Sequence, residues 1–340
     1  MGAVLPILAL HGPTASGKST LAVEIALALA ERGQPAEIVN ADSMLVYRGM
    51  DIGTAKPTLA QRRGVRHHLI DVMSVTESAT VADFQERARE AIAQCRARGV
   101  LPIVAGGSAL YMRAILDHFE FPGTDAAVRA RWESELERLG PEALHAVLAG
   151  RAPATAAEIL PGNGRRTVRA LEVLELTGGH RPTLPAWSYA LDGVESVGLE
   201  LDRPTMDARI AARVEAMWEA GLVDEVRALD ARGLRRGVTA SKAIGYRQVL
   251  DYLDGQCSEA EAREATVAGT KRFARRQLSW FRRDHRIVWH PAGSSGLADA
   301  IAARSLGGPA SVGTQLRPPP VTRQTDPATP PTPPRTVRSR

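Results

Sequence analysis

Residues 12–19 match the phosphate-binding pattern G-x-x-x-x-G-K-[ST] at every fixed position. The segment consists of Gly12, Pro13, Thr14, Ala15, Ser16, Gly17, Lys18 and Ser19. Its two glycines allow the backbone to wrap around a diphosphate, and Lys18 adds a mobile positive charge. The hydroxyl of Ser19 can ligate Mg²⁺. The pattern therefore predicts a site for a diphosphate or triphosphate with Mg²⁺, but it does not identify the molecule that carries the phosphates.

Asp42 follows a second apolar run and puts a carboxylate where the phosphate loop is expected. A carboxylate there can ligate Mg²⁺, or it can act as a general base toward an acceptor. A third role, as the cap of a following helix, is structural only. Ser108 follows Gly106 and Gly107, and its hydroxyl can likewise face a ligand or cap a helix. Residues 51–57, taken alone, predict only a turn.

The clearest basic cluster spans residues 271–286 and contains a single acid, Asp284. Its cations are Lys271, Arg272, Arg275, Arg276, Arg282, Arg283 and Arg286. At about 100° per residue, most of them fall on one face of a helix. The other face carries Phe273, Ala274, Gln277, Leu278, Trp280 and Phe281. A face of nearly one sign favours a polyanion partner, and an ordinary solvated face is the alternative.

Two smaller groups of arginines also have helical spacing. Arg165, Arg166 and Arg169 form one group, and Arg209 and Arg213 form an i, i+4 pair. Arginines on surface helices are commonly solvated. The pair therefore gains a functional role only if the fold brings it to the phosphate loop.

Apolar runs and helical patterns alternate over residues 1–118. Strands are predicted at residues 7–10, 37–39, 69–72 and 100–104, and helices at 18–32 and 82–98. The alternation predicts an α/β fold of the P-loop NTPase type, with a doubly wound parallel sheet and helices on both faces. Ligands bind beyond the carboxyl ends of such strands. The phosphate loop, Asp42 and Ser108 are therefore expected to converge.

Residues 119–190 predict an inserted helical subdomain, with helices at 127–139 and 165–176 separated by prolines. Residues 191–305 are expected to continue the core. Strands are predicted there at 196–201 and 286–289, and helices at 206–220, 222–232, 242–253 and 259–283. Residues 306–340 are predicted to be a disordered tail, because nine of the 22 prolines lie beyond residue 307 among threonines, arginines and serines.

Composition restricts the class of protein further. The 340 residues contain no apolar run of the roughly 20 residues that a membrane span needs, and the first ten residues lack a basic leader. We therefore expect a cytoplasmic protein that does not enter a membrane. Cys95 and Cys257 are too few and too far apart in sequence to indicate disulfides or a zinc site. The predicted tail carries four of the five net positive charges, so net charge alone says little about partners.

Several of these segments together resemble the bacterial tRNA dimethylallyltransferases, in order from about residue 5 to 290. The matching segments are residues 12–19, Asp42-Ser43 with Tyr47, and residues 51–57, 106–111, 243–247 and 271–277. Residues 51–57, Asp-Ile-Gly-Thr-Ala-Lys-Pro, are a hallmark of this family that general phosphate-loop kinases do not share.

The resemblance implies transfer of a dimethylallyl group from dimethylallyl diphosphate to the exocyclic N6 amine of the tRNA adenosine just 3′ of the anticodon. It implies that residues 12–19 hold the diphosphate with Mg²⁺, that Ser19 ligates the metal, and that Asp42 is the catalytic base. Arg209 or Arg213 is implied to help bind the diphosphate. The implied contacts with tRNA come from Asp42, Ser43, Met44, Leu45, Ser108, Arg129, Arg165, Arg166, Thr167, Val168, Arg169, Lys271, Arg275 and Arg282.

Ser108 stands where the family usually has threonine, so the hydroxyl is kept and a methyl is lost. The eukaryotic relatives add a zinc finger for which this sequence has no Cys and His set. We expect a monomer. Two other functions stay open: a phosphate-loop kinase acting on a nucleotide or nucleic acid, which would consume ATP, and a non-catalytic RNA-binding module, which would leave the loop without a role.

Overall fold

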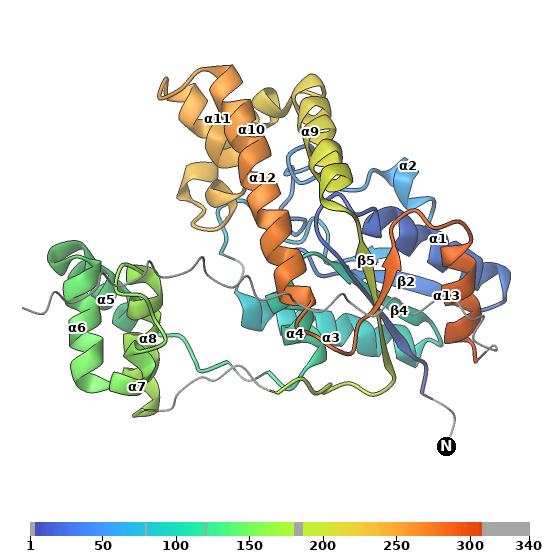
Figure 1. Ribbon diagram of the computed structural model, residues 1–340, viewed down its shortest axis with the longest axis horizontal. Coiled ribbons are helices and arrows are strands. Elements are labelled where there is room, and N and C mark those ends of the chain that lie inside the picture. The colour runs from blue at the N-terminus through green and yellow to red at the C-terminus, as the bar shows by residue number, and fades with distance from the viewer. Residues whose placement is uncertain (1–3, 79, 120, 180–185, 308–340) are drawn as a thin grey trace, which may run out of the picture.

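The computed structural model describes residues 4–78, 80–119, 121–179 and 186–307. In this part of the chain, six parallel strands form one sheet in the order β3-β2-β4-β1-β5-β6 (Figure 1). The strands are β1 (Ile7–His11), β2 (Ala36–Asn40), β3 (His67–His68), β4 (Leu101–Gly106), β5 (Val194–Glu200) and β6 (Val288–Pro291). The predicted α/β fold with a doubly wound parallel sheet is confirmed.

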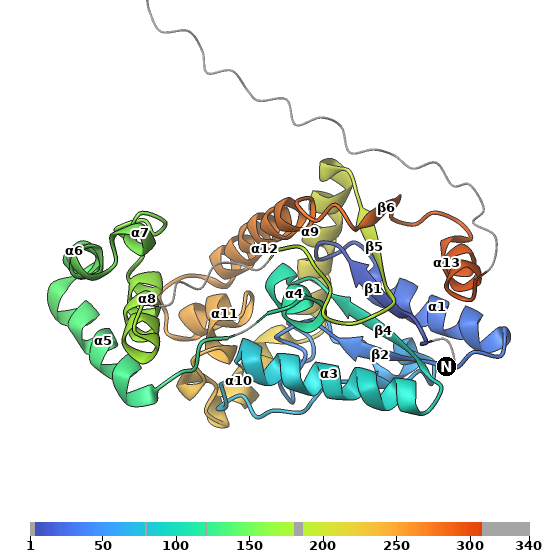
Figure 2. The ribbon, with the colours of Figure 1, turned by 90° about the horizontal axis from the view of Figure 1, so that it is seen from below.

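Helices cover both faces of the sheet because successive side chains of each strand point to opposite sides. Leu8 and Leu10 of β1 join the core formed with α1 (Lys18–Glu31) and α13 (Leu297–Ser305). Ile7 and Ala9 join a second core, which includes residues of α3 (Val81–Ala97) and α4 (Ala109–Leu116). Figure 2 shows α3 and α4 on the side of the sheet away from α13. The phosphate loop between β1 and α1 is thus anchored by packing on both faces.

The predicted strand at residues 69–72 is wrong. The strand at this edge is the two-residue β3, and Leu69 and Asp71 have positive φ angles of 61° and 58°. The Asn40 side-chain amide donates to the Leu69 carbonyl (3.0 Å), and the Lys56 ammonium contacts the Asp71 carboxylate (2.5 Å). Polar side chains from neighbouring loops thus bend a run that its apolar residues alone would have kept extended.

Helices α5 to α8 lie within the segment predicted as an inserted helical subdomain, beside the sheet rather than over it (Figures 1 and 2). They are α5 (Ala126–Leu139), α6 (Pro141–Arg151), α7 (Pro153–Ala156) and α8 (Gly164–Thr177). Trp132, Leu144, Leu148 and Leu171 are among the buried residues of their own small core. The chain leaves and rejoins the main body at adjacent points, since the Ala190 amide donates to the Leu116 carbonyl (2.8 Å).

The helices that follow β5 stand together near the carboxyl end of the sheet (Figure 1). They are α9 (Arg203–Glu219), α10 (Leu222–Ala231), α11 (Tyr246–Leu253) and α12 (Glu259–Phe281), with short 3₁₀ turns at Leu234–Arg236 and Ala240–Lys242. Helix α11 begins four residues later than predicted because the second of these turns precedes it. A one-turn helix, α2 (Leu59–Arg62), lies between β2 and β3. The tail predicted from residue 306 lies almost wholly outside the described residues, and none of the described helices is long and apolar enough to cross a membrane.

Candidate active site

The phosphate loop connects β1 to α1 with a backbone shape that needs glycine at both ends. Gly17 has φ 88°, in the left-handed region, and directly precedes α1. Gly12 has φ 154°, and a Cβ there would lie 3.0 Å from the Leu199 carbonyl oxygen. A side chain at either position would strain the loop. The fixed glycines of the pattern are thus explained by backbone conformation and close packing.

A cavity of about 600 Å³ opens over this loop. Its lining includes Thr14, Lys18, Ser19, Asn40, Asp42, Leu45, Thr54, Gly106, Gly107, Arg209, Arg213, Phe273 and Gln277. The expected convergence of the phosphate loop with the ends of β2 and β4 is therefore confirmed. Ser108 does not line the cavity: it is the N-cap residue of α4, and its hydroxyl makes no capping hydrogen bond.

The cations of the cavity are held close to the loop. The half-buried Lys18 ammonium donates to the Pro13 carbonyl (2.7 Å), and the Arg213 guanidinium lies 3.5 Å from the Thr14 hydroxyl. Burial lowers the pKa of Lys18 to about 8, with Arg213 adding to the shift and Asp42 opposing it. Burial also lowers the pKa of Arg213. Arg209 lines the same cavity but is exposed. Partly desolvated cations of this kind are stabilised by an anion, so the cavity suits a diphosphate.

Asp42 sits in a turn rather than at a helix start. Its carboxylate accepts from the Met44 amide (2.9 Å), and its own amide donates to the Asn40 side chain (2.8 Å). Residues 43–46 form turns and no helix begins there, which removes the helix-cap alternative. Asp42 and Leu45 line the cavity, whereas Ser43 and Met44 do not. The geometry leaves Asp42 as a carboxylate that faces the same space as Lys18 and Arg213.

Residues 51–57 contribute to the lining of the cavity, and hydrogen bonds from other elements hold this segment in place. The Glu225 carboxylate of α10 accepts from the amides of Asp51 (3.0 Å), Ile52 (2.7 Å) and Gly53 (3.2 Å). The Tyr246 hydroxyl also donates to Glu225 (2.5 Å). A Cβ at Gly53 would lie 2.5 Å from the Tyr246 ring, which explains the glycine. Sequence reasoning missed Glu225, because one glutamate on an amphipathic helix has no local signature.

Lys56 anchors the far end of this segment. Its buried ammonium forms ion pairs with Asp51 (2.7 Å) and Asp71 (2.5 Å) and donates to the Tyr47 carbonyl (2.7 Å). It is therefore a structural cation and not a phosphate ligand. Thr54, by contrast, is part of the cavity lining.

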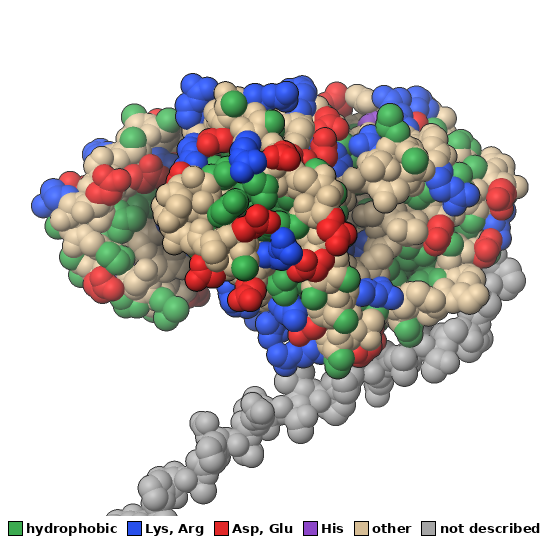
Figure 3. Space-filling view, turned by 90° about the horizontal axis from the view of Figure 1, so that it is seen from above, with side chains coloured by type: hydrophobic (Ala, Val, Ile, Leu, Met, Phe, Trp, Pro, Cys, Tyr) green, Lys and Arg blue, Asp and Glu red, His purple; other side chains and the backbone are tan. Residues whose placement is uncertain are grey.

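The basic surface of α12 consists of Lys271, Arg272, Arg275 and Arg276, and we call it the α12 basic stripe. The three arginines are exposed, and none of the four cations pairs with an acid among the described residues. Arg282 lies 3.8 Å from the Glu200 carboxylate. The face of the molecule in Figure 3 mixes positive and negative side chains, so an unpaired stripe of one sign is a local feature.

The structure gives the residues of the predicted cluster different surroundings. Arg286 differs from the other cations of the cluster, because its guanidinium pairs with Asp117 (2.7 Å) and Asp284 (2.7 Å) and lies over the Tyr189 ring. Phe273 and Trp280 share the predicted arc with Ala274, Gln277 and Phe281 but are 37% and 36% exposed. Helix α12 packs only a narrow strip against the core, since Ala274, Gln277 and Phe281 are the buried residues of this segment.

The second predicted RNA-binding group, on α5 and α8, is partly neutralised inside the protein. Arg129 and Arg169 both pair with the fully buried Glu172 at 2.8 Å. Arg165 and Arg166 are exposed. Thr167 and Val168 are buried, so their side chains are not on the surface for tRNA to touch. Within this group, Arg165 and Arg166 are the cations that remain without an acidic partner in the described structure.

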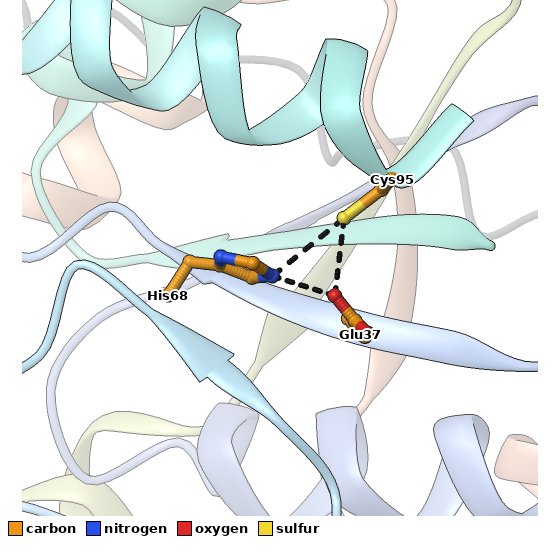
Figure 4. Close-up of side chains that lie close together, drawn as sticks. All are labelled: Glu37, His68 and Cys95. Atoms are coloured by element: carbon orange, nitrogen blue, oxygen red, sulfur yellow. Dashed lines mark hydrogen bonds and ion pairs between the residues drawn. The ribbon is translucent and has the colours of Figure 1, made fainter. Parts of the chain in front are cut away.

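Glu37, His68 and Cys95 bring three possible metal-ligand atoms within 4.8 Å of one another (Figure 4). The sequence spacing gave no sign of this cluster. However, Arg98 donates to both oxygens of Glu37 (2.8 and 2.6 Å) and, with His68 and Cys95, holds the pKa of Glu37 down at about 2 despite burial. Burial raises the pKa of the Cys95 thiol to about 11. Arg98 already supplies the positive charge, and we assign no metal there.

Comparison with known proteins gives one consistent result. The chain matches the family model described as IPP transferase over residues 45–284. It is 61% identical over 292 residues to the tRNA dimethylallyltransferase of Kineococcus radiotolerans, covering 85% of this chain and 91% of the relative. It is 58% identical over 298 residues to that of Thermobifida fusca, covering 87% of this chain and 93% of the relative.

Solved structures with a similar fold are also transferases that act on tRNA. The tRNA isopentenylpyrophosphate transferase of Bacillus halodurans matches with a TM-score of 0.65 and 37% identity, covering 89% of this chain and 96% of that one. A eukaryotic dimethylallyltransferase acting on tRNA matches with a TM-score of 0.71 and 22% identity, covering 90% of this chain and 81% of that one. At that identity, the second match supports the fold alone.

Proposed function

The chain belongs to the IPP transferase family, and we propose that it transfers a dimethylallyl group from dimethylallyl diphosphate to N6 of the adenosine 3′-adjacent to the anticodon in tRNA. The observation that carries this proposal is that one cavity of about 600 Å³ is lined by residues of the phosphate loop, including Lys18, and by Arg213 and Asp42. The side with the phosphate loop, Lys18 and Arg213 suits a leaving diphosphate. Asp42 suits the role of a base that takes a proton from the nucleophile.

On the donor side, the loop amides and Lys18 are proposed to bind the diphosphate, with Arg209 and Arg213 beside it. The bond between the allylic carbon and the diphosphate oxygen breaks, and its electron pair leaves with the diphosphate. Positive charge at this oxygen stabilises the leaving group as charge develops. The exposed Ser19 in the first turn of α1 lines the cavity, and its hydroxyl offers an oxygen ligand that fits Mg²⁺. When bound, Mg²⁺ supplies further charge neutralisation of the diphosphate.

On the acceptor side, the adenine amine is a weak nucleophile because its lone pair is delocalised into the ring. It needs orientation and a base. As nitrogen forms its bond to the allylic carbon, a proton leaves N6, and Asp42 is proposed to accept it. The adenosine must unstack to enter the cavity, which costs least in a loop whose bases are not paired in a duplex.

The tRNA is proposed to approach over the α12 basic stripe and the exposed Arg165 and Arg166. These cations suit the phosphates of the anticodon stem-loop, because backbone contacts position a nucleic acid without reading its sequence. We further propose that the protein works as a cytoplasmic monomer. Size-exclusion chromatography with and without tRNA tests whether the protein is a monomer.

Donor identity is the decisive test, because a phosphate-loop kinase would use the same loop for ATP. Unmodified tRNA is incubated with dimethylallyl diphosphate and Mg²⁺, digested and analysed by mass spectrometry. The adenosine 3′ of the anticodon should gain a five-carbon group, and ATP should be neither required nor consumed. An unaltered adenosine together with hydrolysed ATP would favour the kinase. Tight RNA binding with neither reaction would favour a non-catalytic module.

A further inference from the structure

Helix α12 touches the phosphate loop with the face opposite its basic stripe. Three buried residues, one per helical turn, make these contacts. Ala274 forms a small buried cluster with Met206 and Ile210, against which Ala15 of the loop packs, and the Phe281 ring meets the His11 ring edge-on at 5.3 Å between centroids. Between them, the Gln277 side-chain oxygen accepts from the Thr14 amide (2.8 Å). One helix therefore follows the chain from the end of β1 to the apex of the loop.

The Gln277 amide group has little freedom. Its side chain is only 6% exposed, and one end is held by Thr14. At the other end, a Cβ placed on Gly107 would lie 2.5 Å from the Gln277 nitrogen. The side chain thus fills the gap between the phosphate loop and the loop after β4, and the absence of a side chain at Gly107 makes room for it.

The apex of the loop is where such support matters. Ala15 has φ 62°, a left-handed conformation that is strained for an alanine. Strained residues persist only where their surroundings hold them. The hydrogen bond between Thr14 and Gln277 supplies that hold, together with the packing of Ala15 against the cluster of Met206, Ile210 and Ala274.

We propose that Gln277 is a positioning residue for the donor site: its hydrogen bond to the Thr14 amide keeps the loop apex in the shape that receives a diphosphate. This deepens the proposed function and rests on it only in naming the diphosphate as part of the donor. This role of Gln277 also makes the donor site depend on α12, the helix that carries the basic stripe on its other face.

The test uses the full-length chain and inorganic diphosphate with Mg²⁺ as the probe, measured by calorimetry. Gln277→Met removes the acceptor and keeps most of the side-chain volume. We expect the Kd for diphosphate to rise roughly three- to tenfold, the range for the net contribution of one hydrogen bond. The matched control is Gln94→Met, the same change at an exposed residue of α3 whose side chain donates to Glu90 and has no other hydrogen-bond partner among the described residues. It should leave the Kd unchanged.

Gly107→Ala tests the same contact from the other side. The added methyl should push the Gln277 amide off Thr14 and weaken diphosphate binding to a similar degree. In a Gln277→Ala background there is no amide left to displace. Adding Gly107→Ala there should therefore change the Kd by far less than it does in the wild type. Fully multiplicative effects would mean that the two residues act separately and would overturn the proposal.

Two further readouts separate positioning from mere structural support. The melting temperature and the affinity for an anticodon stem-loop RNA should stay at wild-type values in Gln277→Met. Wild-type diphosphate affinity in this variant would overturn the proposal, and so would equal losses of diphosphate and RNA affinity, because Gln277 would then only hold α12 in place. If the wild type binds diphosphate but transfers no dimethylallyl group, the proposed function fails while this role stands.

Discussion

The cavity over the phosphate loop and the α12 basic stripe lie on two sides of one helix, and they hold positive charge in opposite ways. In the cavity, burial lowers the pKa of Lys18 to about 8 and also lowers the pKa of Arg213. On the stripe, the arginines are exposed to solvent. In the cavity, the charged form of each cation is unfavourable until an anion binds. On the stripe, water already stabilises the charge.

This difference implies that the cavity and the stripe contribute to different steps, the binding of a small anion and the binding of a nucleic acid. A desolvated cation acts strongly on a bound anion, because little water screens it, and its contribution depends on pH. A solvated cation acts through the release of counterions from a nucleic acid, and its contribution depends on salt. Chemistry should therefore respond to changes in the cavity, and docking should respond to changes on the stripe.

The largest effect is expected for Asp42→Asn. This change keeps the size of the side chain but removes the base, so the single-turnover rate of prenyl transfer should fall by about 10²- to 10⁴-fold. RNA affinity should stay near wild type, because Asp42 lies in the cavity and not on the stripe. A rate within a factor of about three of wild type would remove Asp42 as the base.

A pH dependence of donor binding should follow from Lys18. With a pKa of about 8 in the free protein, Lys18 is charged below pH 8 and loses its proton above it. A bound diphosphate favours the charged form, so affinity should be flat below pH 8 and then fall by about tenfold per pH unit until the pKa of the complex is reached. Calorimetric titrations from pH 6 to 9.5 measure this. In Lys18→Met, affinity should be lower and this decline should be absent.

The α12 basic stripe should govern salt dependence. Changing Arg272 and Arg276 together to alanine should flatten the plot of log K for RNA against log[salt] by about 1.4 to 1.8 units. Diphosphate binding at fixed salt is the control and should not change, because both side chains lie on the outer side of α12. An unchanged slope would show that the stripe does not contact RNA.

A smaller effect should distinguish free from paired arginines near α8. Arg166→Ala should flatten the same plot by about 0.7 to 0.9 units. Arg129→Ala should change the slope less but lower the free energy of unfolding of the helical subdomain by about 1–2 kcal/mol, because it removes a partner from the buried Glu172. Equal slopes for the two variants would mean that pairing with Glu172 does not withhold Arg129 from RNA.

The sequence predicted those parts of the site that lie at strand ends. The phosphate loop has a local pattern, and Asp42 follows β2 at the edge where parallel sheets bind ligands. Gln277 and Glu225 could not be assigned roles in this way, because each acts on a loop far away in sequence from a position that looks like any other on an amphipathic helix. Only the packing of α10 and α12 against the loops gives them a partner.

Contacts between distant segments also decide the surroundings of Arg286 and the conformation of residues 69–72. Arg286 lies in a run of basic residues in the sequence, yet its partner Asp117 comes from the end of α4. The run at residues 69–72 was predicted as a strand from its apolar side chains, but hydrogen bonds from Asn40 and Lys56 bend it. Local patterns record composition and period, and both outcomes were decided by contacts between distant segments.

The junction of the helical insertion has a consequence for how the protein can be rebuilt. Leu116 and Ala190 are joined by a hydrogen bond, and Asp117 pairs with Tyr189 as a β-bridge, so the chain re-enters the core where it left it. Arg286 contacts both sides of this junction: it forms an ion pair with Asp117 and lies 3.9 Å from the centre of the Tyr189 ring. Segments whose two ends meet can be exchanged without rethreading their host. Replacement of the insertion at this junction is therefore expected to leave the fold of the core intact.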